Sequence, residues 1–275
     1  MESNYIESTT NQHIKNLVKL RDRKHRNRQD KFFIEGLREI SHAIDSDCLI
    51  ETIYYCPELF NSDKAKQLII NLNSIEHKLI KLVRLHIIAF KKCCYRESPD
   101  GLIALAIPTI SEFKDLDLKD SSTIIILEGI EKPGNLGAII RSADGAGASA
   151  IILDNCAIDL YNPNVIRSSQ GIVFRIPIIV SNHSFIIKWL HSNNFEIIAS
   201  SPSATITHYN LAVTSKTALI MGSESHGLSE SWINQANQKI KIPMNGSADS
   251  LNVSVATAVC LYEIQRQKVQ YQKLG

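Results

Sequence analysis

The chain has 275 residues, of which 44% are hydrophobic and 21% are charged, and its net charge is only +2. This composition is typical of a soluble globular protein, and the length allows two domains that each bury a core. It excludes a polycationic chain.

The cysteines and the apolar runs limit the compartment and the cofactors. Six cysteines form no C-x-x-C pair, and nine histidines form no H-x-x-x-H pair. We therefore expect reduced thiols and no structural metal. The first residues, "MESNYIEST", lack the basic and apolar regions of a signal peptide, and no run approaches 18 apolar residues. These features predict a cytoplasmic protein with no membrane partner.

Positive charge is concentrated near the beginning of the chain. Residues 1–108 carry 17 Lys or Arg against 14 Asp or Glu, whereas the remainder carries 13 against 14. Most of the local excess lies in "RDRKHRNRQDK", residues 21–31. From charge alone, a solvated helix face is the better interpretation, and the segment only favours a phosphate-bearing partner.

Residues 1–108 are predicted to form a smaller α/β domain. Residues 30–44 contain a strand and a helix, 48–56 a strand, 63–73 a helix, and 100–108 the closing strand. The following segment, 109–122, is polar and has no strong core pattern, so we predict a linker there.

From residue 123 onward, strands alternate with helices. We expect strands at 123–130, 149–153, 196–200, 217–222 and 239–244, and helices beginning at Asn135 and at 184–193, 229–237 and 250–270. Short aliphatic strands between helices predict an α/β domain over 123–275, with a mostly parallel sheet covered by helices on both faces.

The helix that begins at Asn135 contains one unexpected residue. Its apolar side chains recur with a 3.6-residue period at Leu136, Ile139, Ile140 and Ala143. Arg141 falls on the other face, among small residues: Gly137, Ala138, Gly145 and Ala148. A face cleared of bulk around a permanent positive charge fits either a partner helix or a ligand.

The glycine-rich stretches do not match the common nucleotide or hydrolase motifs. Gly129 and Gly134 have P-loop spacing, but Asn135 and Leu136 follow where Lys and Ser or Thr belong. No complete G-x-G-x-x-G follows the first strand, which argues against a nicotinamide oxidoreductase. In "GSESHG" the residue two before Ser225 is serine, which does not fit a nucleophile elbow.

Three polar segments remain, each at the carboxyl end of a predicted strand, where α/β sheets bind ligands. They are "EKPGNLGAIIRSADGAG", "MGSESHGLSE" and "IPMNGSADSLNVSV". Taken singly, each has a plain structural explanation. Asn135 or Ser250 would cap a helix, Arg141 would pair with Asp144, and Gly222 would serve a turn. The residues alone thus indicate a polar site and no particular reaction.

In this order and spacing, the three segments resemble the three motifs of the SpoU/TrmH family, the SPOUT class of RNA 2′-O-ribose methyltransferases. "RSSQGIVFRIP" resembles the region between the first two motifs, and "FFIEGLREISHAI" through "GLIALA" resembles the small RNA-binding domain of many members. Lys132 stands before Pro133 where many members have an acidic residue. The resemblance covers nearly the whole chain.

The resemblance implies a trefoil knot in the C-terminal domain, S-adenosylmethionine bound in that knot, and a homodimer. It assigns catalytic roles to Arg141, which would contact the ribose 2′-hydroxyl, to Asn135, which would orient Arg141, and to Glu224, Ser250 and Asn252. It assigns cofactor binding to Gly222, Ile242 and Leu251 through backbone groups, and to Ser200 at the adenosine pocket.

The resemblance also implies an RNA partner, with ribosomal RNA favoured over tRNA. On this reading, the side chains of the basic segment that would contact phosphates are Arg21, Arg23, Lys24, Arg26 and Arg28. A tRNA 2′-O-methyltransferase and a non-catalytic RNA-binding protein on the same fold stay open as alternatives. The presence of Arg141 and Asn252 argues against the non-catalytic one.

Overall fold

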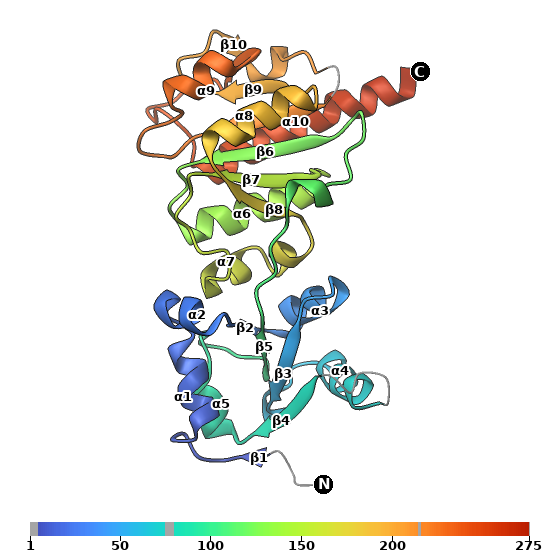
Figure 1. Cartoon of the computed structure of the whole chain (residues 1–275), viewed down its shortest axis with the longest axis vertical. Coiled ribbons are helices and arrows are strands. Elements are labelled where there is room, and N and C mark those ends of the chain that lie inside the picture. The colour runs from blue at the N-terminus through green and yellow to red at the C-terminus, as the bar shows by residue number, and fades with distance from the viewer. Residues whose placement is uncertain (1–4, 75–79, 214–215, 275) are drawn as a thin grey trace. The chain divides into compact units, whose positions relative to one another are not determined.

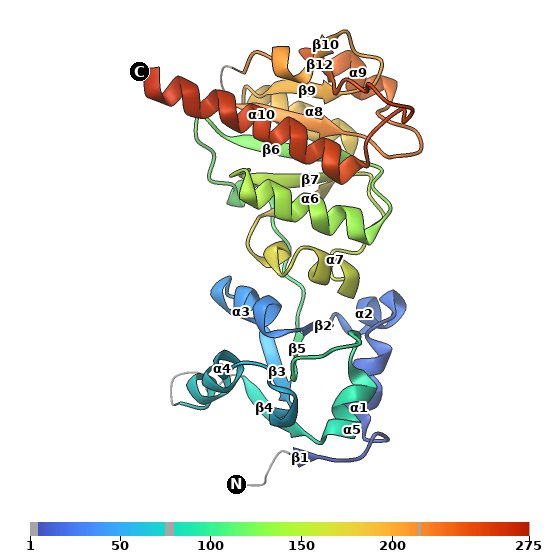
Figure 2. The same cartoon turned by 180° about the vertical axis from the view of Figure 1, so that it is seen from behind.

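The computed structural model describes residues 5–74, 80–213 and 216–274, and it divides into two compact units (Figures 1 and 2). Unit 1 comprises Met1–Thr109 together with Asp159–Arg175, and unit 2 comprises Ile110–Ile158 together with Ile176–Gly275. The sequence places 159–175 in the C-terminal domain, whereas in the structure this segment packs with the N-terminal residues.

Unit 1 contains a five-stranded sheet in the order β1-β4-β3-β5-β2. β1, β4 and β3 are parallel, and β5 runs antiparallel to both β3 and β2. The elements are β1 (Tyr5–Ile6), α1 (Gln12–Lys19), α2 (Arg23–Gln29), β2 (Phe32–Glu35), α3 (Leu37–Asp45), β3 (Ile50–Tyr55), α4 (Asp63–Asn73), β4 (Lys81–Leu85), α5 (Ile87–Cys93), β5 (Leu102–Ala106) and α7 (Pro163–Ser168).

The core of unit 1 lies between the sheet and the two helices α1 and α5. Ile14 and Leu17 of α1 and Phe90 of α5 are fully or almost fully buried against Ile103 of β5. The segment after Ile158 joins this unit through aromatic stacking, because the Tyr161 ring lies 4.1 Å from that of Phe32, centroid to centroid.

Unit 2 contains a seven-stranded sheet in the order β10-β12-β9-β11-β6-β7-β8, and every neighbouring pair is parallel. The elements are β6 (Thr123–Glu128), α6 (Pro133–Gly145), β7 (Ala150–Asp154), β8 (Ile178–Ser181), α8 (His183–Ser192), β9 (Glu196–Ser200), β10 (Ile206–Thr207), β11 (Thr217–Met221), α9 (Glu230–Gln235), β12 (Gln238–Lys241) and α10 (Val253–Leu274).

Helices cover both faces of this sheet. α8 and α9 lie over one face (Figure 1), and α6 and α10, which pack against each other, lie over the opposite face (Figure 2). Residues 123–127 of β6 are all buried, as expected for a strand with helices on both sides. The predicted α/β class, with a mostly parallel sheet covered on both faces, is confirmed.

The segment 109–122 is more than a linker. The Phe113 ring centroid lies 5.1 Å from that of Phe185 and 4.7 Å from that of Trp189, and Leu116 and Leu118 pack on the same core. Three apolar residues spread over a polar segment are enough to attach it to unit 2.

Two helix boundaries differ from the sequence prediction. α6 begins at Pro133, where a missing N–H costs nothing, so Asn135 lies inside the first turn and is not the cap. α10 begins at Val253, and Asn252 Oδ1 accepts from the Ser254 N–H at 3.0 Å. Asn252 therefore caps this helix, and the prediction that Ser250 caps it was wrong.

Within the part of the chain that the structure describes, no helix combines the length and the hydropathy that spanning a bilayer requires.

Candidate active site

The polar segments of the three motifs meet at the carboxyl edge of the sheet of unit 2. One follows β6, one follows β11 and one follows β12, and these strands run in the same direction. Parallel strands bring their carboxyl ends to a single edge, so residues nearly 120 positions apart in sequence come into contact there.

Glu224 is the centre of the hydrogen-bonded group at this edge. Its Oε1 accepts from Asn252 Nδ2 at 2.6 Å and from Asn135 Nδ2 at 3.0 Å. The two asparagines also approach each other, with 3.3 Å between Asn252 Nδ2 and Asn135 Oδ1. The structure thus brings together three of the five predicted catalytic residues, each from a different motif.

Lys132, the residue that departs from the family pattern, completes this group. Its Nζ lies 2.5 Å from Glu224 Oε2, and the lysine side chain is 71% exposed. The hydrogen bond from Lys132 holds the pKa of Glu224 below its usual value, aided by the amide of Asn135. The carboxylate is therefore ionised at neutral pH and acts as an acceptor that orients both amides.

The loop that carries Glu224 is closed by two glycines. A Cβ at Gly222 would lie 2.2 Å from the backbone carbonyl of Gly227, and Gly227 has a φ of +67°. The Gly227 N–H donates to Ser223 O at 3.0 Å, and this bond closes the turn. Only glycine at position 222 permits this close approach of the backbone.

Two cavities of about 190 Å³ each adjoin this loop. All four predicted cofactor-binding residues line the first, together with Ser250: these are Ser200, Gly222, Ile242 and Leu251. Asn135 and Lys132 line the second. Both cavities are bounded by Ser223, Glu224 and Val253, so two ligands could meet beside Glu224.

The first cavity has the chemistry that S-adenosylmethionine requires. Met221, Ile242, Met244 and Leu251 supply an apolar wall that suits an adenine ring, and several serine hydroxyls supply polar contacts. The carboxylates of Glu224 and Asp249 also line it, and they suit the positive charges of the sulfonium and the amino group.

Arg141 lies on α6 apart from the Glu224 group. It is exposed and lines neither cavity, and its side chain is joined to no other residue in the described part of the chain by an ion pair or hydrogen bond. The alternative ion pair with Asp144 is not formed. Part of the small-residue face is covered by α10, because Gly145 lies against the Tyr262 hydroxyl. Arg141 itself is left open to a ligand.

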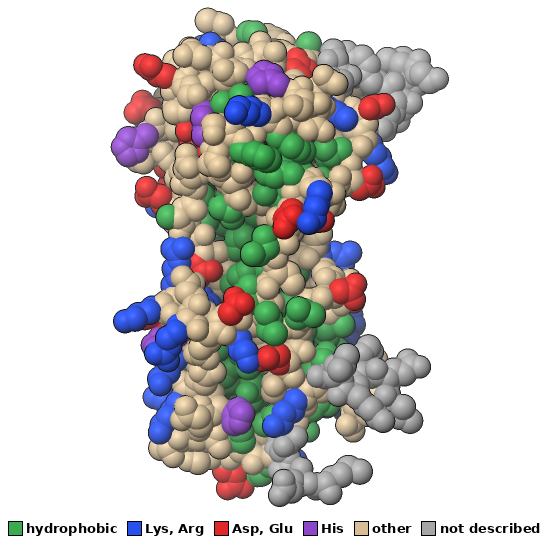
Figure 3. Space-filling view, viewed as in Figure 1, with side chains coloured by type: hydrophobic (Ala, Val, Ile, Leu, Met, Phe, Trp, Pro, Cys, Tyr) green, Lys and Arg blue, Asp and Glu red, His purple; other side chains and the backbone are tan. Residues whose placement is uncertain are grey.

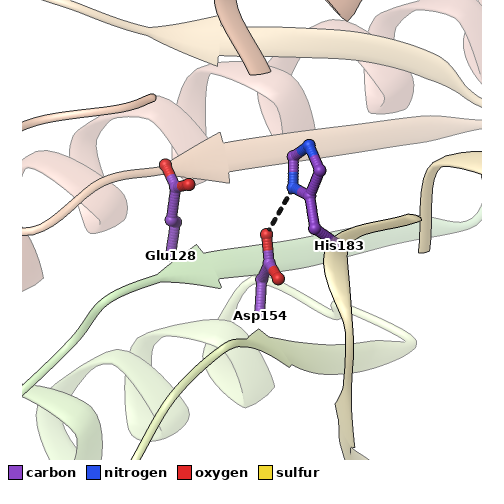
Figure 4. A group of neighbouring side chains, drawn as sticks. All are labelled: Glu128, Asp154 and His183. Atoms are coloured by element: carbon purple, nitrogen blue, oxygen red, sulfur yellow. Dashed lines mark hydrogen bonds and ion pairs between the residues drawn. The ribbon is translucent and has the colours of Figure 1, made fainter. Parts of the chain in front are cut away.

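A second polar group, which sequence reasoning missed, consists of Glu128 at the end of β6, Asp154 at the end of β7 and His183 at the start of α8 (Figure 4). Asp154 is fully buried, and its Oδ2 accepts from His183 Nδ1 and from Trp232 Nε1, both at 2.8 Å. The other ring nitrogen of His183 lies 2.6 Å from Ser231 Oγ.

This group holds residues 229–232, which follow the loop that carries Glu224. Besides the contacts of Asp154 and His183 to α9, Glu128 Oε2 accepts from the Ser229 N–H at 2.8 Å. The three side chains could offer ligand atoms to a metal ion, since these atoms lie within 4.8 Å of one another. Both carboxylates, however, already accept hydrogen bonds from the protein. An acid at the end of each buried strand, "TIIILE" and "AIILD", was the available sequence signal.

The basic segment of unit 1 forms α2 with its flanks, and Lys and Arg side chains gather over α1 and α2 (Figure 3). Arg23, Lys24 and Arg28 are exposed, as an interface with phosphates requires. Arg21 is half-buried and donates to the backbone carbonyls of Lys92 and Cys94.

Arg26 corrects the sequence prediction. It is only 5% exposed, pairs with Asp159 at 2.5 Å, and donates to the carbonyls of Leu20 and Arg21 at 2.7 Å each. Its guanidinium is used inside the fold, because a buried cation needs a buried anion and carbonyl acceptors. Arg26 is therefore not a phosphate contact.

Two family models match the chain. The SpoU rRNA Methylase family model matches residues 122–262, and the MRM3-like substrate binding domain model matches residues 11–104. Among curated relatives, the 23S rRNA (guanosine(2553)-2′-O)-methyltransferase of Bacillus subtilis is 26% identical over 94% of this chain and 98% of its own length.

Two solved structures match this chain over more than nine tenths of its length. One described as an RNA 2′-O ribose methyltransferase is 36% identical, covers 96% of this chain and 99% of its own, and has a TM-score of 0.84. The SpoU methyltransferase AviRb from Streptomyces viridochromogenes, in complex with its cofactor AdoMet, is 25% identical over 94% and 98% of the two chains, with a TM-score of 0.82.

Proposed function

The chain belongs to the SpoU rRNA Methylase family, and we propose that it transfers a methyl group from S-adenosylmethionine to a ribose 2′-hydroxyl of ribosomal RNA. The observation that carries this proposal is the pair of cavities that share Ser223, Glu224 and Val253. S-adenosylmethionine occupies the first cavity and supplies an electrophilic methyl group, and the target ribose enters the second.

The residues of this chain contribute mainly by positioning. A 2′-hydroxyl is a weak nucleophile, so the protein must hold it in line with the methyl group and stabilise the oxyanion that develops. Glu224, which lines both cavities, fixes the amides of Asn135 and Asn252, and Asn135 lines the second cavity.

In this proposal Arg141, which lies on α6 outside both cavities, supplies the positive charge for the oxyanion when RNA is bound. A guanidinium is rarely deprotonated, so it acts as a donor and not as a base, and the hydroxyl proton leaves to a phosphate or to water. Its planar fork can bind a hydroxyl and a neighbouring phosphate together, which suits an exposed arginine that has no partner within the described chain. Ser250, on the cofactor side, has a supporting role.

The proposal extends to the compartment, the knot and the oligomeric state of the enzyme. We place the enzyme in the cytoplasm, where its six unpaired cysteines stay reduced, and we assign to it the trefoil knot of its family. It acts as a homodimer, because Val255, Tyr262 and Val269 recur every seven residues on α10 and are 37–53% exposed. This spacing places them on one side of the helix, where they form an apolar stripe.

Transfer of a labelled methyl group to total RNA tests the proposal. RNA from cells that lack the gene is incubated with the protein and labelled S-adenosylmethionine, and the modified nucleotide is mapped by primer extension. We expect a single labelled ribose in ribosomal RNA. Label in tRNA, on a base, or in no RNA would contradict the proposal, and binding of the cofactor without transfer would favour a non-catalytic protein.

A further inference from the structure

Unit 1 contains a cavity of about 990 Å³, far larger than either cavity at the active site. It lies between α3, the segment 95–100, the beginning of α4 and the end of α7. Its lining is mostly polar and charged, which suits a hydrophilic ligand and not an apolar small molecule.

One wall of this cavity is braced by three carboxylates. Glu35 accepts from the N–H groups of Tyr95 and Arg96, at 2.7 Å and 3.2 Å respectively. Asp100 Oδ2 accepts from the Leu37 N–H at 2.7 Å, and Glu39 pairs with Arg96 at 2.6 Å. Glu35 and Glu39 are only 6% and 4% exposed, so this arrangement buries charge in order to fix one short segment.

Two oxygen atoms of these carboxylates lack partners within the described chain, which is uncommon for buried polar groups. Glu39 Oε2 and Asp100 Oδ1 are buried and have no hydrogen-bond partner among the residues that the structure describes. Gly36, beneath them, has a φ of +113°, and a Cβ there would lie 2.3 Å from Glu39 Oε2. Glycine adopts this φ without strain, whereas buried polar atoms that lack partners carry a cost, and a bound ligand is one way to satisfy them.

The braced segment presents an aromatic ring to the cavity. Tyr95 is 42% exposed although its backbone is fixed by Glu35. The same cavity is lined by three exposed cations, Arg38, Lys64 and Arg167, which form no ion pair within the described residues, and by the carboxylates of Glu39, Asp45, Glu97 and Asp100. An exposed ring on a fixed segment, beside cations that form no ion pair within the described residues, suits the binding of a single-stranded nucleotide.

We propose that this cavity binds an unpaired nucleotide of the RNA substrate, with its base stacked on Tyr95 and its flanking phosphates held by Arg38, Lys64 and Arg167. This inference rests on the proposed function, since it takes the substrate to be RNA. It assigns a recognition site to unit 1 that is separate from the cations of α2. At about 990 Å³, the cavity is large enough for a base and its ribose.

Tyrosine substitutions provide the sharpest test. In Tyr95→Ala, the Kd for ribosomal RNA extracted from cells that lack the gene should rise about 5- to 150-fold, the range expected for loss of one base-stacking contact. In Tyr95→Phe it should stay within about twofold of the wild-type value, because stacking needs the ring and not the hydroxyl. Tyr209→Ala, at a tyrosine 56% exposed in unit 2, is the matched control and should not change the Kd.

The cations are tested by the salt dependence of binding. Replacing Arg38, Lys64 and Arg167 together by Gln should lower the slope of log K against log salt by about 2, at roughly 0.7 per phosphate contact on a single strand. The same replacement at Lys81, Lys91 and Lys92, exposed on the same unit, should leave the slope unchanged. Calorimetric titration with S-adenosylmethionine and the unfolding temperature check that each variant is folded.

The outcomes separate this inference from the proposed function. If the wild type methylates ribosomal RNA while Tyr95→Ala binds it as tightly as the wild type, the nucleotide site is wrong and the activity stands. If Tyr95→Phe and Tyr95→Ala lose the same amount of affinity, the proposal that a base stacks on the Tyr95 ring is wrong. If the wild type does not bind the RNA, both are wrong. If free nucleoside monophosphates displace the RNA equally from wild type and Tyr95→Ala, the cavity is not where the nucleotide binds.

Discussion

At the scale of single residues, Arg141 is the group whose substitution separates catalysis from binding. Its side chain is exposed and packs in no core, whereas Leu136, Ile139 and Ile140 on the opposite face are fully buried. Arg141→Ala should therefore unfold at the wild-type temperature and bind S-adenosylmethionine normally. Methyl transfer should fall about 10²- to 10³-fold, the loss typical of one transition-state donor.

The conservative variant sharpens this prediction. Arg141→Lys should recover only part of the rate, because an ammonium cannot span a hydroxyl and a phosphate as a planar fork can. Single-turnover rates with saturating RNA measure the chemical step for both variants. Turnover within a few-fold of wild type in Arg141→Ala would remove Arg141 from the catalytic residues.

Lys132 allows a second prediction at this scale, on pH dependence. The pKa of Glu224 is lowered chiefly by the hydrogen bond from Lys132, and the ionised carboxylate orders Asn135 and Asn252. In Lys132→Met this pKa should return toward the usual value, so the acidic limb of the rate–pH profile should move to higher pH. An acidic limb at the same pH in wild type and variant would show that Glu224 titration does not limit the rate.

At the scale of elements, α2 contains both exposed cations and one buried cation, which are expected to respond differently. Replacing Arg23, Lys24 and Arg28 by Gln should weaken RNA binding and reduce its salt slope by about 2, with stability unchanged. Arg26→Ala should cost about 3 kcal/mol in the free energy of unfolding, because it leaves Asp159, which is only 13% exposed, without its cation.

The measurements for α2 are urea unfolding and filter binding at several salt concentrations. The triple variant and Arg26→Ala serve as controls for each other. A wild-type salt slope in the triple variant would leave α2 as an ordinary solvated helix, and a stable Arg26→Ala would contradict the structural role of the ion pair.

The end of α10 gives a pH prediction for stability. Lys268 Nζ donates to Ser121 O, Ser122 O and Thr123 Oγ1 at 2.7–3.1 Å, and burial lowers its pKa from the ordinary 10.5 to about 8. Between pH 8 and 10.5 the unfolded chain then binds more protons than the folded one, so the stability contributed by Lys268 rises with pH. The loss caused by Lys268→Met should be larger at pH 10 than at pH 7 in urea unfolding. A loss that shrinks with pH would contradict this assignment.

The helices and strands differ in how well the sequence predicts them. β6, β7, β9 and β11 were predicted within one or two residues, because burial on both faces requires unbroken aliphatic runs. α2 was predicted only as a solvated helix face, and the burial of Arg26 was not predicted, because it depends on a contact to Asp159, 133 positions away. Local patterns contain no information about such a partner.

Some residues of the candidate site could be predicted from the sequence and others could not. Asn135, Glu224 and Asn252 each belong to a motif, so a resemblance can find them, and parallel strands bring them together. The Lys132–Glu224 contact joins residues 92 apart, and the brace of Asp154 and His183 joins residues 29 apart with no motif around them. Both depend on where loops end in space, which only the fold determines.

At the scale of the whole molecule, the apolar stripe of α10 predicts the assembly. Val255, Tyr262 and Val269 lie on one side of this helix and are exposed, while Leu261 and Ile264 on another side are buried in the protomer. A second copy of the chain would cover the stripe in an isologous interface, and light scattering should return twice the 30.8 kDa of one chain at micromolar concentration.

Tyr262→Arg should shift the protein to the monomer, because a guanidinium buried in that interface would lack an anion. Ile88→Arg, at a residue 62% exposed on α5, is the matched control and should leave the mass unchanged. A wild-type mass of one chain, or a Tyr262→Arg variant that dissociates no more readily than wild type, would contradict dimerisation through α10.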